Sequence, residues 1–301
     1  MVEQEKFKSG FVAIIGRPNV GKSTLLNQLV GHKVAIMSDK PQTTRHKIHS
    51  IITRDDAQII FLDTPGIHKP RHKLGEYMVE VALGALREVD VILFLVEPQL
   101  PGPGDEYIIN QLREVTTPVI LVINKIDLLD NKAELLPLID VFSQKYNFAE
   151  IIPVSALKPE NLDRLVELVV SYLPSGPKYY PDNMVTDRPE QFIMAELIRE
   201  KVLHLTAQEV PHGVTVVVEE VEPRSDQLLY VRAVIYTEKE SHKAILIGKG
   251  GRMLKEIGRL AREEMELLLG SKIYLDLWVK VKEDWRNQDL YLRNFGYTDR
   301  D

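Results

Sequence analysis

The chain has 301 residues, of which 44% are hydrophobic and 27% charged, a balance typical of a folded globular protein with roughly two domains. It contains no cysteine, which excludes disulfides, thiolate metal sites and cysteine nucleophiles. The net charge of −6 argues against a protein that coats nucleic acid through bulk charge, and no apolar run approaches the ~20 residues of a membrane span. We therefore expect neither secretion nor insertion into a membrane.

The first motif in chain order is a phosphate-binding loop with the sequence Gly16-Arg17-Pro18-Asn19-Val20-Gly21-Lys22-Ser23-Thr24. An apolar run before it predicts a buried strand, and leucines after it lie on one face of a predicted helix. Gly16 and Gly21 let backbone N–H groups surround a phosphate at the start of that helix. We expect Lys22 to neutralise the β and γ phosphates and the Ser23 hydroxyl to ligate Mg²⁺.

A polar segment, 38–46, follows and is broken by Pro41, so it predicts a loop. In nucleotide switches built on a phosphate-binding loop, a threonine at this place joins the Mg²⁺ shell only when the γ-phosphate is present. Thr43 and Thr44 are the two candidates, and we favour Thr44 while the sequence leaves Thr43 open. The alternative is a solvated loop rich in threonine.

Two predicted strands, 48–53 and 58–62, come next, and the second leads directly into Asp63-Thr64-Pro65-Gly66. An aspartate at the end of a strand beside the phosphate loop can hold Mg²⁺ through water, and the Gly66 N–H can sense the γ-phosphate. Alone, Asp-x-x-Gly is a weak turn signature, so its value here comes from its position.

Continuous apolar runs at 89–96 and 118–123 predict buried parallel strands, and the second ends in Asn124-Lys125-Ile126-Asp127. The Asp127 carboxylate can accept two hydrogen bonds from the N1–H and amine of guanine, whereas adenine would leave that carboxylate unpaired. Another short strand ends in Ser155-Ala156-Leu157, whose backbone is placed to close over the guanine edge.

These motifs stand in a fixed order at strand ends, and together they resemble the translation-factor-related class of P-loop GTPases over roughly residues 9–173. The resemblance implies a doubly wound α/β sheet that binds GTP with Mg²⁺ and hydrolyses the nucleotide. The nucleotide-binding residues that we predict are Gly16, Asn19, Val20, Gly21, Lys22, Ser23, Thr24, Asp63, Gly66, Asn124, Lys125, Asp127, Ser155, Ala156 and Leu157.

Ile67 stands where the Ras-like branch of the class has a glutamine that orients the attacking water, so we expect slow hydrolysis by the isolated protein. In some relatives the asparagine found here as Asn19 helps to bind K⁺; as a hypothesis Asn19 does the same, and the alternative is a turn residue. The predicted catalytic residues are Lys22, Asn19, Thr44 and Gly66. The predicted metal ligands are Ser23, Thr43, Thr44 and Asp63.

Three prolines and one glycine fall within 174–183, which predicts a linker. We therefore divide the chain into an N-terminal tail (1–8), a first domain (9–173), this linker and a second domain (184–301). The second domain opens with a predicted helix and two strands.

The decisive stretch of the second half is Ile247-Gly248-Lys249-Gly250-Gly251, at a predicted helix–turn–helix junction. It matches the GXXG loop of KH domains, which clamps the backbone of single-stranded RNA. With a last predicted strand at 272–281, the order of elements is that of an α+β, type II KH domain. The alternative is a structural turn with a solvated basic face.

The region around this loop is basic, with seven Lys or Arg against two Glu between 239 and 262 in an otherwise acidic chain. Such a patch favours contact with phosphates. The RNA-binding residues that we predict are Ile247, Gly248, Lys249, Gly250, Gly251, Arg252, Lys255 and Arg259.

A GTPase domain followed by one KH domain resembles the Era family of bacterial ribosome-assembly GTPases over nearly the whole chain. The resemblance implies binding of the single-stranded 3′ end of small-subunit ribosomal RNA during maturation of the small subunit. It also implies a cytoplasmic location and, for some members, peripheral association with the cytoplasmic membrane.

Two other classes of protein are the alternatives. One is a metabolic nucleotide-driven enzyme whose second domain binds a small substrate, and the other is a GTPase whose second domain docks a protein. We further expect GTP and Mg²⁺ to order the loops around Thr43, Thr44 and 63–66, and so to control whether the RNA groove is open.

Overall fold

A computed structural model describes residues 7–297 with the exception of 39, 41 and 226, so most of the predicted N-terminal tail lies outside the described residues. The chain divides into two compact units. The first contains Met1–Met37, Thr44–Pro70 and Met78–Asp187, and the second contains Ser38–Thr43, Arg71–Tyr77 and Arg188–Asp301. None of the helices in the described part of the chain has the length and apolar character that a membrane span requires.

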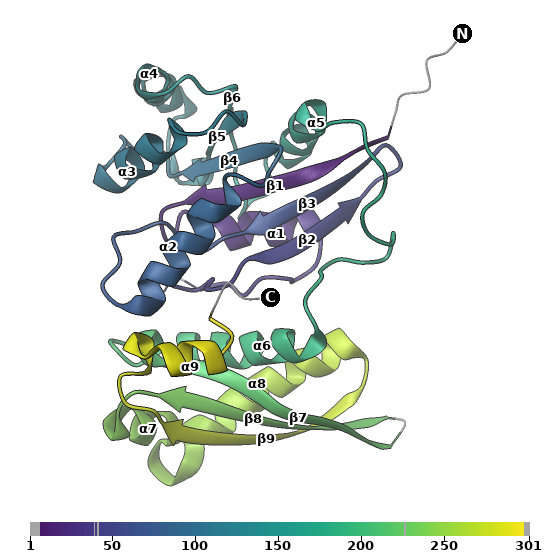
Figure 1. Ribbon diagram of the computed structural model, residues 1–301, viewed down its shortest axis with the longest axis vertical. Coiled ribbons are helices and arrows are strands. Elements are labelled where there is room, and N and C mark those ends of the chain that lie inside the picture. Colours follow the sequence, from purple (N-terminus) through teal and green to yellow (C-terminus); the bar gives the residue numbers. More distant parts are fainter. Residues whose placement is uncertain (1–6, 39, 41, 226, 298–301) are drawn as a thin grey trace. The chain divides into compact units, whose positions relative to one another are not determined.

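The first unit is built on a six-stranded sheet with the order β2-β3-β1-β4-β5-β6 (Figure 1). Only the β2–β3 pair is antiparallel. Strands β4 and β5 are buried along their whole length, which explains their continuous apolar sequences. The strands are β1 (Lys8–Gly16), β2 (Ile48–Thr53), β3 (Ala57–Asp63), β4 (Val91–Val96), β5 (Val119–Ile123) and β6 (Glu150–Pro153).

Helices cover both faces of this sheet because successive side chains of a strand point to opposite sides. Val12 and Ile14 of β1 pack in one apolar cluster with residues of α1 and α5, and Ala13 and Ile15 pack in another with residues of α2, α3 and α4. The helices are α1 (Lys22–Val30), α2 (Lys73–Ala85), α3 (Pro103–Leu112), α4 (Leu135–Lys145) and α5 (Leu162–Tyr172). The first turn of α2 belongs to the second unit.

The predicted linker is tied to the first unit. Ser9 donates its backbone N–H to the Pro174 carbonyl at 3.1 Å, and the Gln58 side chain accepts from the N–H groups of Tyr179 and Tyr180 at 2.7 and 3.0 Å. Ile51 donates to the Val185 carbonyl at 3.0 Å. These bonds fix the segment along the first unit.

The second unit has a three-stranded sheet, β7-β8-β9, in which β8 is antiparallel to β7 and parallel to β9. Side chains from α6, α8 and β8 share its apolar core. Its main elements are α6 (Glu190–Leu205), β7 (Thr215–Ser225), β8 (Leu228–Thr237), α7 (Glu240–Ile247), α8 (Arg252–Leu269), β9 (Lys272–Val281) and the short α9 (Asp289–Asn294). Up to β9 this is the order of helices and strands predicted for a type II KH domain.

Candidate functional site

The phosphate-binding loop connects β1 to α1, with Gly21 as the N-cap of the helix at φ 99°. A Cβ atom at this position would lie 2.4 Å from the Asn124 amide nitrogen, so both the backbone angle and the available space require glycine. Val20 is buried, and Thr24 lies half-buried in the first turn of α1. The first N–H groups of an α-helix have no partner within the helix, so this helix start suits an anion.

Lys22 lies buried beneath the loop, and its ammonium donates to the carbonyls of Gly16 at 3.3 Å and Arg17 at 3.1 Å. Burial lowers the pKa of Lys22 to about 8, against the opposing effect of the Asp63 carboxylate. An anionic phosphate beside the ammonium would favour its charged form again. The loop therefore holds a cation in place for a phosphate.

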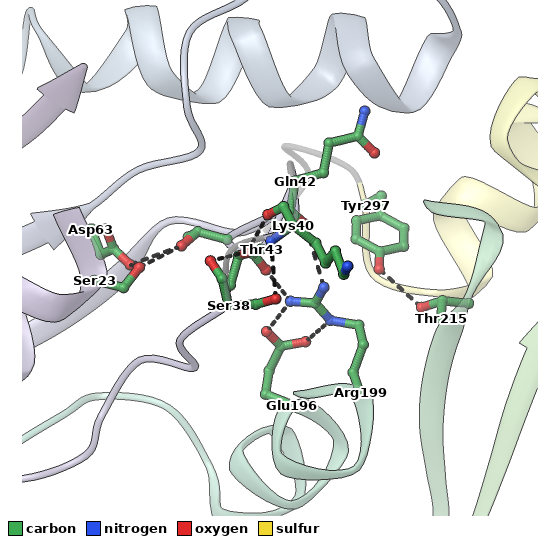
Figure 2. Close-up of polar contacts among 11 residues, drawn as sticks. Ser23, Ser38, Lys40, Gln42, Thr43, Asp63, Glu196, Arg199, Thr215 and Tyr297 are labelled. Atoms are coloured by element: carbon green, nitrogen blue, oxygen red, sulfur yellow. Dashed lines mark hydrogen bonds and ion pairs between the residues drawn. The ribbon is translucent and has the colours of Figure 1, made fainter. Parts of the chain in front are cut away.

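Ser23, Thr44 and Asp63 converge on one point beside the loop. The Ser23 and Thr44 hydroxyls lie 3.0 Å apart, and they donate to the same oxygen of Asp63 at 3.3 and 3.1 Å. Figure 2 shows the Ser23 and Asp63 side chains pointing toward one another. Burial raises the pKa of Asp63 to about 6, and Lys22 opposes the rise.

This cluster fits a magnesium ion. The other carboxylate oxygen of Asp63, Oδ1, is buried and makes no hydrogen bond to any described residue. A metal-bound water would satisfy that oxygen, and two hydroxyls with a carboxylate form the hard oxygen donor set that Mg²⁺ prefers.

The structure brings Thr44, and not Thr43, to this cluster. The Thr43 hydroxyl donates to the Lys40 carbonyl at 2.7 Å and to the Ser38 carbonyl at 3.4 Å, within its own loop. The geometry therefore favours Thr44 for the metal position that the sequence left open between the two.

Gly66 lies directly against the phosphate loop. A Cβ atom there would be 2.8 Å from the backbone nitrogen of Pro18, and the next residue, Ile67, donates its N–H to the Gly16 carbonyl at 3.1 Å. The Ile67 side chain is buried in the core of the first unit. It thus contributes packing at the position where the Ras-like branch has a glutamine.

The predicted guanine-binding segments meet around Asn124, which is buried. Its amide nitrogen donates to the Val20 carbonyl at 2.9 Å, and its oxygen accepts from the Ala156 N–H at 3.1 Å. The Ser155 hydroxyl donates to Asp127 at 2.7 Å. One amide thus joins the phosphate loop to the base-binding segments, and one serine orients the carboxylate that we expect to read the base.

Lys125 and Leu157 of the predicted set are less buried than Asn124. The Lys125 ammonium donates to the Asn19 carbonyl at 2.7 Å and pairs with Glu97. The Leu157 side chain is exposed. Sequence reasoning did not identify Glu97 as part of this site, because no pattern around Glu97 marks it as the partner of Lys125, 28 positions away.

Arg17, inside the phosphate loop, is a second contact that sequence reasoning missed. Its Nε donates to Asp105 at 2.8 Å, and Asp105 also accepts the N–H of Gly102 at the start of α3. Arg17 is therefore engaged by the protein itself. No local pattern signals this pair, since the two residues are 88 positions apart.

The glycine-rich loop of the second unit joins α7 to α8. Gly248, Gly250 and Gly251 all have positive φ angles, of 72°, 61° and 77°. A Cβ atom on Gly248 would lie 2.7 Å from the Met253 Cβ, but one on Gly250 or Gly251 would meet nothing within 4 Å. The turn thus leaves open space beside the last two glycines, where a backbone phosphate can approach.

The basic residues predicted to bind RNA differ in their surroundings. Lys249, Arg252 and Lys255 are exposed, near or within the first turn of α8. Arg259 is exposed too, but its guanidinium bonds Glu256 at 2.6 and 2.9 Å and Glu263 at 2.8 and 2.9 Å. The sequence count treated Arg259 as a free positive charge, whereas the helix pairs it with two carboxylates. Ile247 is half-buried beside the core.

Comparison with known proteins identifies relatives of both units. A family model described as 50S ribosome-binding GTPase matches residues 11–125, and one described as KH domain matches residues 209–286. GTPase Era of Clostridioides difficile (strain 630) is 58% identical over 296 residues, which cover 98% of this chain and 100% of that protein. The predicted fold class, a P-loop GTPase sheet followed by a KH domain, is confirmed.

Solved structures extend this likeness. The crystal structure of Era in complex with MgGDPNP and nucleotides 1506–1542 of 16S ribosomal RNA is 47% identical, with a TM-score of 0.94 over 97% of this chain and 99% of that one. An Aquifex aeolicus Era variant bound to GDP and aluminium fluoride is also 47% identical, with a TM-score of 0.94 over 97% of this chain and 100% of that one.

Proposed function

This chain belongs to the Era family of GTPases, and we propose that it is a GTP-driven switch that binds the 3′ end of small-subunit ribosomal RNA through its KH domain. We propose further that it acts in assembly and maturation of the small ribosomal subunit. The observation that carries the proposal is that one chain holds two sites. One is the cluster of Ser23, Thr44 and Asp63 beside the phosphate loop, which fits Mg²⁺, and the other is the glycine loop Gly248–Gly251 with basic residues at the start of α8. The likeness to an Era bound to MgGDPNP and 16S ribosomal RNA supports it.

In the nucleotide site, each residue has a distinct task. Lys22 holds the β and γ phosphates while the N–H groups at the start of α1 surround them. Ser23, Thr44 and Asp63 would hold Mg²⁺, which neutralises charge that develops on the phosphates. Asp127, oriented by Ser155, accepts the N1–H and amine of guanine.

Hydrolysis by the isolated protein is expected to be slow because Ile67 points into the core and cannot position water. We propose that K⁺ near Asn19 supplies positive charge in place of an arginine finger. Hydrolysis rates measured in K⁺ and in Na⁺ at equal ionic strength test this role, and equal rates would reject it.

The RNA site is tested with a labelled single-stranded RNA that has the sequence of a small-subunit ribosomal 3′ end, against a scrambled RNA at two salt concentrations. Binding is measured with GDP and with a non-hydrolysable GTP analogue. Sequence-selective, salt-dependent binding that favours the analogue supports the proposal. Indifference to RNA sequence and nucleotide would leave a GTPase whose second unit docks a protein.

A matched pair of variants locates the site. Gly251→Asp puts a carboxylate where we expect a phosphate, and Gly270→Asp puts one at the opposite end of α8. Both glycines have a left-handed φ, at 77° and 66°, and neither would bring its Cβ within 4 Å of another atom. The backbone strain is therefore comparable, and we expect only Gly251→Asp to abolish RNA binding. Equal loss in both variants would contradict the assignment.

Two parts of the proposal rest on the family resemblance alone. These are a cytoplasmic location and a peripheral contact with the cytoplasmic membrane. Both stay predictions, and fractionation of cells that express the tagged chain tests them.

A further inference from the structure

Arg199, on α6, is buried to 1% exposure, and it binds the backbone of the loop that precedes Thr44. The segment Ser38–Thr43 lies in the same compact unit as α6. The guanidinium donates to the Thr43 carbonyl through Nη2 and to the Gln42 carbonyl through Nη1 at 3.4 Å. Figure 2 shows it between Glu196 and these two residues.

The charge of Arg199 is neutralised within α6. Glu196 accepts from Nε at 2.7 Å and from Nη2 at 2.6 Å, one helical turn away. Burial favours the neutral form, but the Glu196 carboxylate outweighs it, so the pKa of Arg199 is raised. A buried guanidinium still needs acceptors for its remaining donors, and here the loop carbonyls supply them. Displacement of the loop would leave those donors without these acceptors.

The loop leads directly into the cluster of Ser23, Thr44 and Asp63. Thr43 carries the carbonyl that Arg199 binds, and the next residue, Thr44, carries the hydroxyl that contacts Ser23 and Asp63 at 3.0 and 3.1 Å. Consecutive Cα atoms are about 3.8 Å apart. A shift of Thr44 on binding or loss of the γ-phosphate must therefore move the acceptor of Arg199.

Helix α6 also packs against α8, the helix that starts at the RNA loop. Ile198 and Val202 of α6 share an apolar cluster with Ile257 and Ala261 of α8. Lys201 of α6 also pairs with Glu264 of α8. Because α8 begins immediately after Gly251, a displacement of α6 is transmitted to the end of the RNA loop through rigid, packed helices.

We infer that Arg199 is a positioning residue that ties the nucleotide-dependent position of Thr43 and Thr44 to RNA affinity, with Glu196 holding its guanidinium. This inference rests on the proposed function, since it names the residue through which the switch acts. It requires that GTP and RNA each change the affinity for the other by one and the same factor.

The test measures that factor in the full chain as the ratio of the RNA Kd with GDP to the RNA Kd with the GTP analogue. We expect a ratio of at least ~10 in the unmodified protein, within the range of known allosteric couplings. Arg199→Gln removes the charge and the forked guanidinium and leaves one shorter amide, so it should bring the ratio to within about twofold of one. Arg199→Lys keeps the charge opposite Glu196 but loses the forked donor geometry, so its ratio should be intermediate.

Arg224→Gln is the matched control, because it removes an exposed arginine from the same unit and should leave the ratio unchanged. Circular dichroism verifies the fold of each variant, and if Arg199→Gln does not fold, Arg199→Lys decides. A folded Arg199 variant with the unmodified ratio would overturn the inference and leave the proposed function intact. A ratio of one in the unmodified protein would instead refute the proposed switch itself.

Discussion

Thr44→Ala, compared with Thr43→Ala, separates the two candidate metal ligands. Thr44 loses a hydroxyl that lies 3.0 Å from Ser23 and 3.1 Å from Asp63, whereas Thr43 loses bonds to carbonyls of its own loop. A hydrogen bond to a charged group contributes about 2 kcal/mol, and each 1.4 kcal/mol is tenfold in affinity, so Thr44→Ala should weaken binding of the magnesium-bound GTP analogue by about 30-fold. Thr43→Ala should weaken it by less than about threefold.

The assay is the Kd of a fluorescent GTP analogue with Mg²⁺ and with a chelator. The Thr44→Ala defect should vanish in the chelator, because the lost group acts through the metal. GDP binding should change little in both variants, since a threonine of this loop joins the Mg²⁺ shell only when the γ-phosphate is present. The reasoning is refuted if Thr43→Ala shows the larger magnesium-dependent loss, or if the Thr44→Ala defect persists without magnesium.

Two further predictions concern unfolding, one at Gly248 and one at Asp63. Gly248→Ala should lower the free energy of unfolding by about 3 kcal/mol, because the φ of 72° and ψ of 172° at this position suit only glycine and the new Cβ would lie 2.7 Å from the Met253 Cβ. Gly250→Ala places its Cβ in open space, so it should lower the free energy of unfolding by only about 1 kcal/mol. Urea unfolding of the two variants measures this difference, and equal costs would contradict it. Burial raises the pKa of Asp63 from 3.8 to about 6 in the nucleotide-free protein without magnesium. The folded state therefore binds the Asp63 proton more tightly than the unfolded state does, and the resulting stabilisation is fully present below pH ~4 and is lost as the pH rises through ~6. Asp63→Asn does not titrate, so it should raise the melting temperature at pH 7.5 and lose that advantage near pH 4; a pH-independent difference would refute the assignment.

The sequence by itself determined the local chemistry. The phosphate loop and the Gly248–Gly251 turn could be predicted because each depends on a few consecutive residues. In both, glycines allow a tight backbone turn directly before a helix. Continuous apolar runs likewise identify β4 and β5, because a strand that is buried on both faces needs apolar side chains at every position.

Only the tertiary structure decided which side chains meet. It separated Thr44 from Thr43 by where each hydroxyl points, and it paired Arg259 with two glutamates that a charge count treats as separate. It also grouped 38–43 with the second unit, where Arg199 reaches a carbonyl 156 positions away. Contacts of this kind depend on how distant segments orient in space, and residue type and spacing along the chain carry no record of that orientation.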